Sequence, residues 1–222
     1  MSKSFESKGF TTTLQPFGEN ILIMQCTFLS IYSNLDGGAI SLFSTHTENL
    51  TVKSCIFKNC VVSDSAGAIY SSAFKTQISE SCFLSCYGKT YSTILVVRSE
   101  RNACNATNNY IEGSQSESYF TLDFPQKTLQ INMNYTNLHS SRYCIGYHPR
   151  DFGKSITKFS IFNNSKIEIL DFNIVENTLI SNISVDQIEC QKVVRCSFKN
   201  LIPISSKIKM TVYYSIEDSY FD

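Results

Sequence analysis

The sequence of 222 residues contains no run of about 18 apolar residues, so it encodes no membrane-spanning helix. Charge is also scarce, because charged residues make up 17% of the chain and 19 basic side chains balance 19 acidic ones. Such a balance creates no electric field that would attract nucleic acid or an anionic membrane. We therefore expect no nucleic-acid partner and no membrane span within this chain.

The start of the chain lacks the apolar core of a secretory signal. The first ten residues carry Lys3, Glu6 and Lys8 instead. The chain is therefore expected to be either cytosolic or a segment of a longer protein. Residues 219–222 resemble part of another strand, which favours the segment, since a repeat array normally ends in a polar cap. We expect residues 1–19 to form an N-terminal extension or cap, and residues 20–222 to form one domain that continues or is truncated at its C-terminus.

Residue spacings typical of metal and phosphate sites are missing as well. The cysteines show no CxxC spacing with histidine of the kind that a structural zinc site needs. Gly37-Gly38 is not followed by the Lys-Ser/Thr of a phosphate loop. The histidines are dispersed and have no nucleophile in a motif beside them: His46, His139 and His148. We expect no catalytic residue, no cofactor and no metal from these patterns.

What the chain does contain is a repeated spacing of apolar residues at i, i+2, i+5 and i+7. Its copies are Ile21, Ile23, Cys26, Phe28; Leu50, Val52, Cys55, Phe57; and, with weaker members, Thr76, Ile78, Ser81, Phe83. A Gly-Ala-Ile step follows the first two copies, at residues 38–40 and 67–69. Recurrence at roughly 25 to 30 residues indicates a solenoid, in which each unit buries its apolar face by stacking on its neighbours.

The spacing within one repeat predicts short strands joined by tight bends. Residues i and i+2 point inward from one strand, and the jump to i+5 places a bend, at Lys53-Ser54 in the second copy, before the next strand. The Gly-Ala-Ile step supplies a third strand close to the core. We predict an all-β parallel β-helix of about eight coils with three short strands per coil. A β-sandwich is the alternative, because it also has short strands between polar turns.

Later copies of the repeat are harder to place. Two stretches that fit all four positions are Ile167, Ile169, Phe172, Ile174 and Ile183, Val185, Ile188, Cys190. These candidate units lie too close together to fix one register between Phe162 and Phe198. From about Asn102 to Phe162 the pattern is degenerate, and the coils there are predicted only by continuity.

Nine cysteines are many for a cytosolic protein and an odd number for a disulfide framework. Cys26, Cys55 and Cys196 each precede a Phe by two residues, whereas Cys60 and Cys86 each follow one by three. Equivalent positions stack in a solenoid, so we interpret these residues as buried free thiols that pack as small apolar groups. Disulfides between some of them, or a metal site, are the alternatives.

Several of these steps resemble a known family. Residues 55–60 read Cys-Ile-Phe-Lys-Asn-Cys, residues 67–70 read Gly-Ala-Ile-Tyr and residues 37–40 read Gly-Gly-Ala-Ile. They resemble the repeats of the polymorphic membrane proteins and related right-handed parallel β-helix proteins, which share the pectate-lyase-like fold. Phe162-Asn163-Asn164 and Phe198-Lys199-Asn200 resemble further copies, although the full Gly-Gly-Ala-Ile occurs once. The resemblance implies a right-handed β-helix, commonly exposed at the cell surface, that is adhesive rather than catalytic.

The same fold hosts polysaccharide lyases and hydrolases, so an enzyme is the alternative function. Those enzymes need carboxylates that project from neighbouring coils. The nearest approach to a lyase set is Asp123, Lys127, Arg150 and Asp151, which have no periodic relation and are better explained as solvated charges. Three acidic residues on one outer face of adjacent coils would favour the enzyme.

Asparagines follow the repeat Phe at Asn59, Asn164 and Asn200. Asn tolerates the left-handed backbone of tight corners and can form hydrogen-bonded ladders, so we assign these residues a structural role rather than ligand binding. We expect a non-enzymatic surface or extracellular domain that binds protein or glycan partners. An intracellular scaffold is a further alternative, consistent with reduced thiols. The irregular middle, from about Asn102 to Lys154, is where function is most expected.

Overall fold

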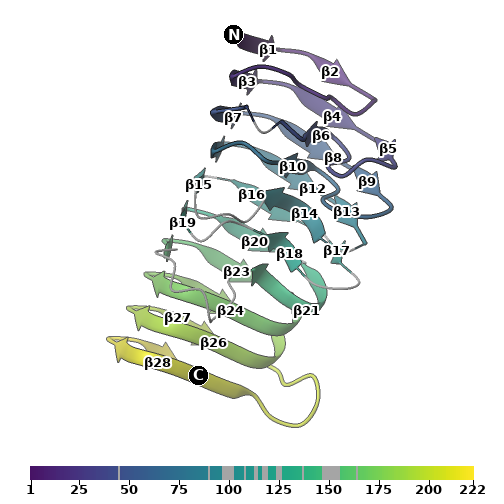
Figure 1. The fold of residues 1–222 in the computed structure, drawn as a ribbon. Coiled ribbons are helices and arrows are strands. Elements are labelled where there is room, and N and C mark those ends of the chain that lie inside the picture. Colours follow the sequence, from purple (N-terminus) through teal and green to yellow (C-terminus); the bar gives the residue numbers. More distant parts are fainter. Residues whose placement is uncertain are drawn as a thin grey trace.

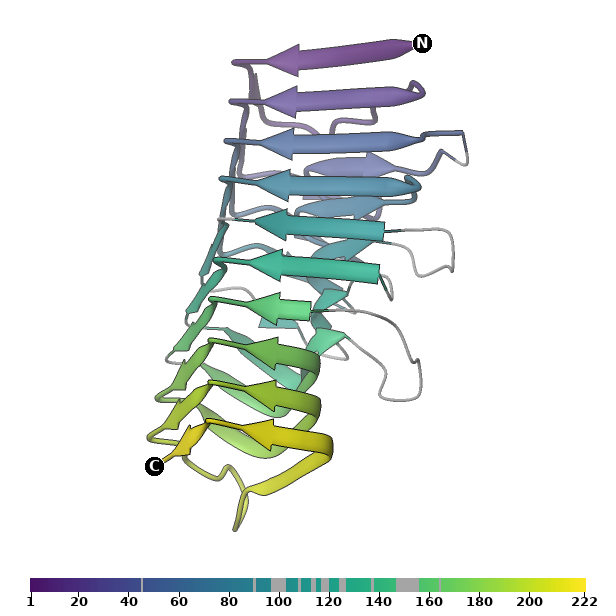
Figure 2. The same ribbon diagram turned by 90° about the vertical axis from the view of Figure 1, so that its left-hand side faces the viewer.

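The computed structural model describes residues 1–44, 46–89, 91–96, 103–107, 109–112, 115–116, 120–123, 127–136, 138–146, 156–163 and 165–222. Within these ranges the regular elements are twenty-nine β-strands, and this part of the chain contains no helix. The strands form two sheets, of ten and nineteen strands, whose pairings are parallel. Figures 1 and 2 show the strands stacked one above another from the N-terminus to the C-terminus. The all-β class is confirmed, and parallel pairing argues against an antiparallel sandwich.

The ten-stranded sheet takes one short strand from each repeat. Its strands are β2 (Gly9–Phe10), β4 (Thr27–Leu29), β8 (Ile56–Lys58), β12 (Cys82–Leu84), β16 (Tyr110–Glu112), β20 (Asn134–Thr136), β23 (Ile161–Asn163), β25 (Leu179–Ser181), β27 (Ser197–Lys199) and β29 (Tyr220–Phe221). The inward residue of most of these strands is aromatic, and Phe28, Phe57 and Phe83 stack face to face at 4.8 and 4.7 Å between ring centroids. The repeat Phe is therefore a core residue, as its spacing predicted.

The nineteen-stranded sheet contains three stacks in the first half of the chain. One stack is β1 (Ser2–Glu6), β3 (Asn20–Met24), β7 (Asn49–Lys53), β11 (Lys75–Ser79), β15 (Ala103–Thr107), β19 (Lys127–Ile131) and β22 (Ile156–Lys158). A second is β5 (Tyr32–Ser33), β9 (Val61–Val62), β13 (Tyr87–Gly88) and β17 (Gln115–Ser116). The third is β6 (Ile40–Leu42), β10 (Ile69–Ser71), β14 (Tyr91–Val96) and β18 (Phe120–Asp123). A repeat of the first half thus has four strands, because the two-residue strand of the second stack comes in addition to the three expected.

Longer strands replace these stacks in the second half. They are β21 (His139–Gly146), β24 (Lys166–Glu176), β26 (Ser184–Val194) and β28 (Lys209–Glu217). Strand β21 pairs with both β17 and β18, and β24 pairs with both β21 and β22, so one continuous strand follows the path of two or three earlier ones. Figure 2 shows the long strands curving through the green and yellow part of the chain toward the C-terminus.

The repeat positions of the first half lie in register. Ile21 pairs with Leu50, and Ile23 pairs with Val52, and all four side chains are buried. The predicted bend is present too, since Ser54 has a left-handed backbone with φ of 53°. Equivalent residues before the smaller sheet share this conformation: Ser7, Gln25, Glu80, Asn132, Phe159, Asn177, Arg195 and Asp218. A left-handed residue therefore turns the chain from one sheet into the other.

The register of the second half corrects the sequence prediction. Phe162 pairs with Ile180 and Ile180 with Phe198, which makes these repeats only 18 residues long. The stretches that begin at Ile167 and Ile183 are therefore not copies of the first unit, but lie along the long strands β24 and β26. The repeat shortens because these strands run through without the loops that separate the three stacks in the first half.

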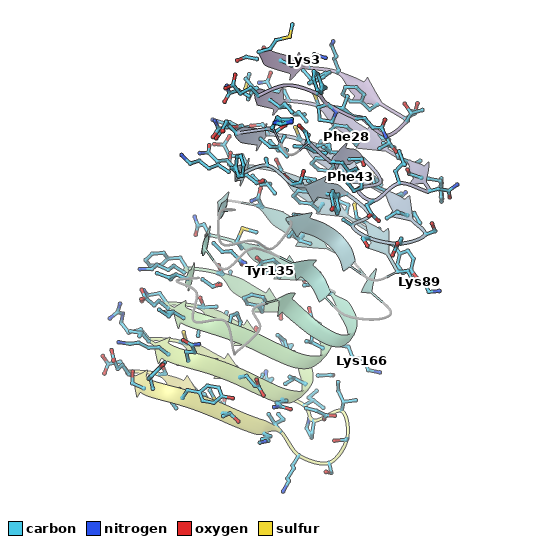
Figure 3. All side chains as sticks on the ribbon, viewed as in Figure 1. Lys3, Phe28, Phe43, Lys89, Tyr135 and Lys166 are labelled. Carbon is cyan, nitrogen blue, oxygen red and sulfur yellow. The ribbon has the colours of Figure 1, made fainter. Side chains whose placement is uncertain are left out.

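The N-terminal residues continue both sheets. Strand β1 pairs with β3 over five residues, and β2 pairs with β4, with Phe10 stacked on Phe28 at 4.8 Å. Residues 1–19, expected as an extension or cap, thus contain two strands in the same register as the repeats. Figure 3 shows the core position of Phe28 and the outward direction of Lys89 and Lys166.

Candidate functional site

The cysteine position before the repeat Phe is a hydrogen-bonding position. The Cys55 thiol donates to the carbonyl of Lys53 at 3.2 Å, and the Cys55 main-chain N–H donates to the Ser81 hydroxyl at 3.1 Å. Ser81 repeats the pattern, because its hydroxyl donates to the Ser79 carbonyl at 2.9 Å and its N–H donates to the Asn109 side-chain oxygen at 2.9 Å. Each side chain therefore provides an acceptor for the main-chain N–H that follows the left-handed bend of the preceding repeat.

The same position is hydrogen-bonded further along the chain. The main-chain donors there are Met133, Ser160 and Cys196, and their acceptors are the hydroxyls of Ser160, Thr178 and Ser219. The thiols at this position are buried, as expected, but packing as small apolar groups is only part of their role. The sequence indicates this hydrogen-bonding role, because Cys alternates at this position with Ser, Thr and Asn, all of which carry a short polar group.

Burial makes two of these thiols poor nucleophiles. It raises the pKa of the Cys55 thiol to about 11 and also raises the pKa of Cys196. Because the thiolate is the reactive form, such groups are inert at neutral pH. No disulfide joins any of the seven cysteines whose side chains are described, and no group of three metal-ligating side chains occurs among the described residues.

The asparagines at the second corner adopt the left-handed conformation that the sequence predicted. Asn59 and Asn200 have φ of 54° and 49°, and Asn182, which follows Ile180, has the same conformation. The Asn200 amide donates to Asn182 at 3.1 Å, and the Asn182 amide donates to Asn163 at 3.0 Å. This amide ladder is structural. Asn164 lies outside the described residues.

The candidate lyase residues do not form a described site. Asp123 ends β18, which pairs with β14 and β21, whereas Lys127 begins β19, which pairs with β15 and β22. Arg150 and Asp151 lie outside the described residues, as does His148. His139 begins β21, and His46 is exposed in the turn before β7.

Two carboxylates from neighbouring repeats lie close together at Asp36 and Asp64. Burial raises the pKa of Asp36, and the negative charge of Asp64 raises it further. Ser65 contacts both, because its N–H donates to Asp36 at 3.0 Å and its hydroxyl donates to Asp64 at 3.3 Å. These contacts give the pair a structural role in the turn before the Gly-Ala step. A pair of carboxylates is also smaller than the cluster of three that would favour an enzyme.

A first hollow lies near the N-terminus. It has a volume of about 640 Å³ and is lined by Met1, Phe17, Gly18, Glu19, Ser44, His46, Glu48 and Phe74. The amino group of Met1 contacts the Glu19 carboxylate at 3.1 Å, and the Lys3 ammonium lies 5.9 Å from the centre of the Phe17 ring. Two groups that could attract a ligand here, the Glu19 carboxylate and the Phe17 ring, therefore already lie beside cationic groups of the chain itself.

A second hollow, here called the tyrosine hollow, lies over the second stack. Its volume is about 340 Å³, and its lining consists of Tyr32, Ser33, Asn34, Val61, Val62, Ser63 and Tyr87. Strands β5, β9 and β13 lie on the right-hand side of Figure 1, which is the side from which Lys89 projects in Figure 3. Sequence reasoning missed this site because its residues come from three successive repeats and belong to none of the repeat positions.

No family model, curated protein or solved structure matches this chain. Among the described residues, no helix has the length and apolar character that crossing a bilayer would require. The site itself must therefore carry the functional argument.

Proposed function

We propose that this chain is a right-handed parallel β-helix in which each strand of the ten-stranded sheet marks one coil. The parallel register and the alternation of the two sheets along the chain support this architecture. The count of coils then rises from about eight to ten, because β2 adds a coil at the N-terminal end and the repeats after Phe162 are short. The likeness of residues 37–40 and 55–60 to polymorphic membrane protein repeats supports the handedness.

We further propose that the domain is a non-enzymatic binding module for protein or glycan partners at a cell surface. The observation that carries this function is the tyrosine hollow, which combines aromatic rings with hydroxyl and amide groups on an outer face. Aromatic and small polar side chains are typical of adaptable binding surfaces. In contrast, the Cys, Phe, Asn and Gly positions of the repeat all have structural roles that explain them.

The test is binding to immobilised extracellular proteins and polysaccharides, with pectin included. Saturable binding to at least one surface is expected, with no release of unsaturated or reducing sugar from any polysaccharide. Release of such products would instead establish the polysaccharide lyase or hydrolase. Absence of binding to every surface would contradict the binding function.

An intracellular scaffold is a second candidate, favoured by the lack of disulfides among the seven described cysteines. Disulfides persist in oxidising compartments and are rare in the cytosol. Counting reactive thiols after denaturation without reductant, in protein from its native source, separates the two compartments. Nine reactive thiols would favour the scaffold, whereas paired cysteines would favour a secreted form.

A further inference from the structure

We propose that the tyrosine hollow binds one neutral pyranose ring of a glycan, seated between Tyr32 and Tyr87. This inference rests on the proposed binding function and specifies its ligand. Within the described ranges, seven residues line the hollow.

The geometry of three successive strands creates the space for one ring. Tyr32 pairs with Val61 and Val61 pairs with Tyr87, so the two tyrosines stand on either side of the valine in one outward row. Two strand spacings separate their backbones by about 9 to 10 Å. Carbon atoms in contact lie about 3.5 to 4.0 Å apart, so this gap is wide enough for a single puckered ring. Val61 forms the apolar floor.

Exposure and hydrogen bonding agree with a ligand at this position. Tyr32 is 77% exposed, so its ring is accessible to a ligand. The Ser33 hydroxyl accepts a hydrogen bond from the N–H of Leu35 at 3.0 Å, which fixes the position of its oxygen at the edge of the hollow. The rim is thus partly organised before a ligand arrives.

The chemistry of the lining selects a neutral, hydroxyl-rich ligand. The rim provides two hydroxyls and one amide, from Ser33, Ser63 and Asn34, and none of the lining residues is charged. A sugar ring presents apolar C–H faces to the tyrosines and hydroxyl groups to the rim. A uronic acid would have no cationic partner among these residues, so its carboxylate would lose hydration without compensation.

Proline-rich peptides also pack against tyrosine side chains and are the nearest competing ligand. Such peptides lie in an extended aromatic groove and present few hydroxyl groups. The short Val61 floor and the hydroxyl and amide rim fit a single sugar ring better. Binding of a proline-rich peptide is therefore one of the outcomes that the experiment distinguishes.

The experiment measures binding of methyl glycosides of neutral hexoses and N-acetylhexosamines by saturation-transfer NMR, with methyl glucuronide and a decaproline peptide as comparisons. The hollow is shallow, so a dissociation constant of roughly 1 mM or weaker is expected for a single sugar. Removal of one ring by Tyr32→Ala is expected to weaken binding roughly three- to tenfold. The variant Tyr32→Phe, which keeps the ring, should bind within about twofold of the original chain.

The matched control is Tyr214→Ala, which removes a tyrosine of 70% exposure from β28 at the other end of the molecule. It should leave sugar binding unchanged. The inference is overturned if no neutral glycoside binds, if Tyr32→Ala binds as well as the original chain, or if decaproline binds more tightly than every sugar. Binding to an immobilised protein that does not depend on Tyr32 would refute the sugar site and leave the proposed binding function standing.

Discussion

The main-chain nitrogen of Cys55 donates a 3.1 Å hydrogen bond to the hydroxyl of Ser81, which lies 26 residues later in the sequence and in the next repeat. Both residues are buried, so neither group has access to water as a substitute partner. A buried N–H without an acceptor costs about 1 to 3 kcal/mol. The bend of each repeat is therefore stabilised by the side chain of the following one.

We expect Ser81→Ala to lower the free energy of unfolding by about 1 to 3 kcal/mol, because it removes the acceptor of the Cys55 N–H, while the Ser79 carbonyl keeps the N–H of Ser54 as a donor. Urea titration followed by circular dichroism measures the change. Ser81→Cys is the matched control, since Cys occupies this position in two earlier repeats, and it should cost less than Ser81→Ala. Equal losses in the two variants would contradict the hydrogen-bonding role.

We expect Phe57→Ala to cost about 3 to 5 kcal/mol of unfolding free energy. Phe57 is completely buried, and its ring is stacked between those of Phe28 and Phe83. Phe57→Ile is the control, because Ile111 and Ile180 fill the equivalent position in other repeats. The isoleucine variant should retain most of the stability. A mild effect of alanine would show that the stack is not a principal part of the core.

We expect Gly38→Ala to be strongly destabilising, because an added Cβ would lie 2.4 Å from the carbonyl oxygen of Gly67 in the next repeat. Backbone atoms cannot move away as a flexible side chain can. Gly9→Ala is the control, since a Cβ at that position would meet no atom within 4 Å. Thermal unfolding of the two variants checks the difference, and similar melting temperatures would contradict the close approach.

We expect alkaline pH to destabilise the protein partly through Cys55. Burial raises the pKa of this thiol from 9.0 to about 11 in the folded state, so its contribution to stability is complete below about pH 9 and is lost as the pH rises toward 11. Comparing unfolding free energies at pH 8 and pH 10.5 should show a loss of about 1 to 2 kcal/mol from this group. Cys55→Ser should remove that part of the pH dependence, and an unchanged pH profile would argue against the shift.

The sequence predicted the first half of the fold well because each position there is chemically distinct. Ile23 and Val52 point inward in neighbouring strands, and the Gly-Ala-Ile steps at residues 38–40 and 67–69 give the paired strands β6 and β10. In the middle, the same inward position is filled by Gln130 and then by Thr157, both buried. The Tyr135 hydroxyl donates to the Gln130 side-chain oxygen at 2.5 Å, so tertiary contacts permit a polar core residue that no apolar pattern reveals.

The second half and the candidate site could not be read in the same way. In β24 and in β26, one continuous strand takes the place of strands from the three separate stacks of the first half. The spacing of its inward residues resembles that of the first repeat, but the bend of that repeat is absent from the strand. The tyrosine hollow depends on the pairing that places Tyr32 and Tyr87 on either side of Val61. This placement is set by the number of residues in two successive repeats. Function was expected in residues 102–154, and that expectation stays a prediction; the hollow that we propose as a site lies before these residues.

The change in repeat length, from 29 residues between Phe28 and Phe57 to 18 between Phe162 and Ile180, leaves the pairing of the ten-stranded sheet unbroken. Chain can therefore be added or removed outside that sheet without altering its vertical spacing. The spacing between strands of the ten-stranded sheet stays constant, whereas the length of the loops on the opposite side of the molecule can vary. A surface on that side can change its shape while the positions of its supporting strands stay the same.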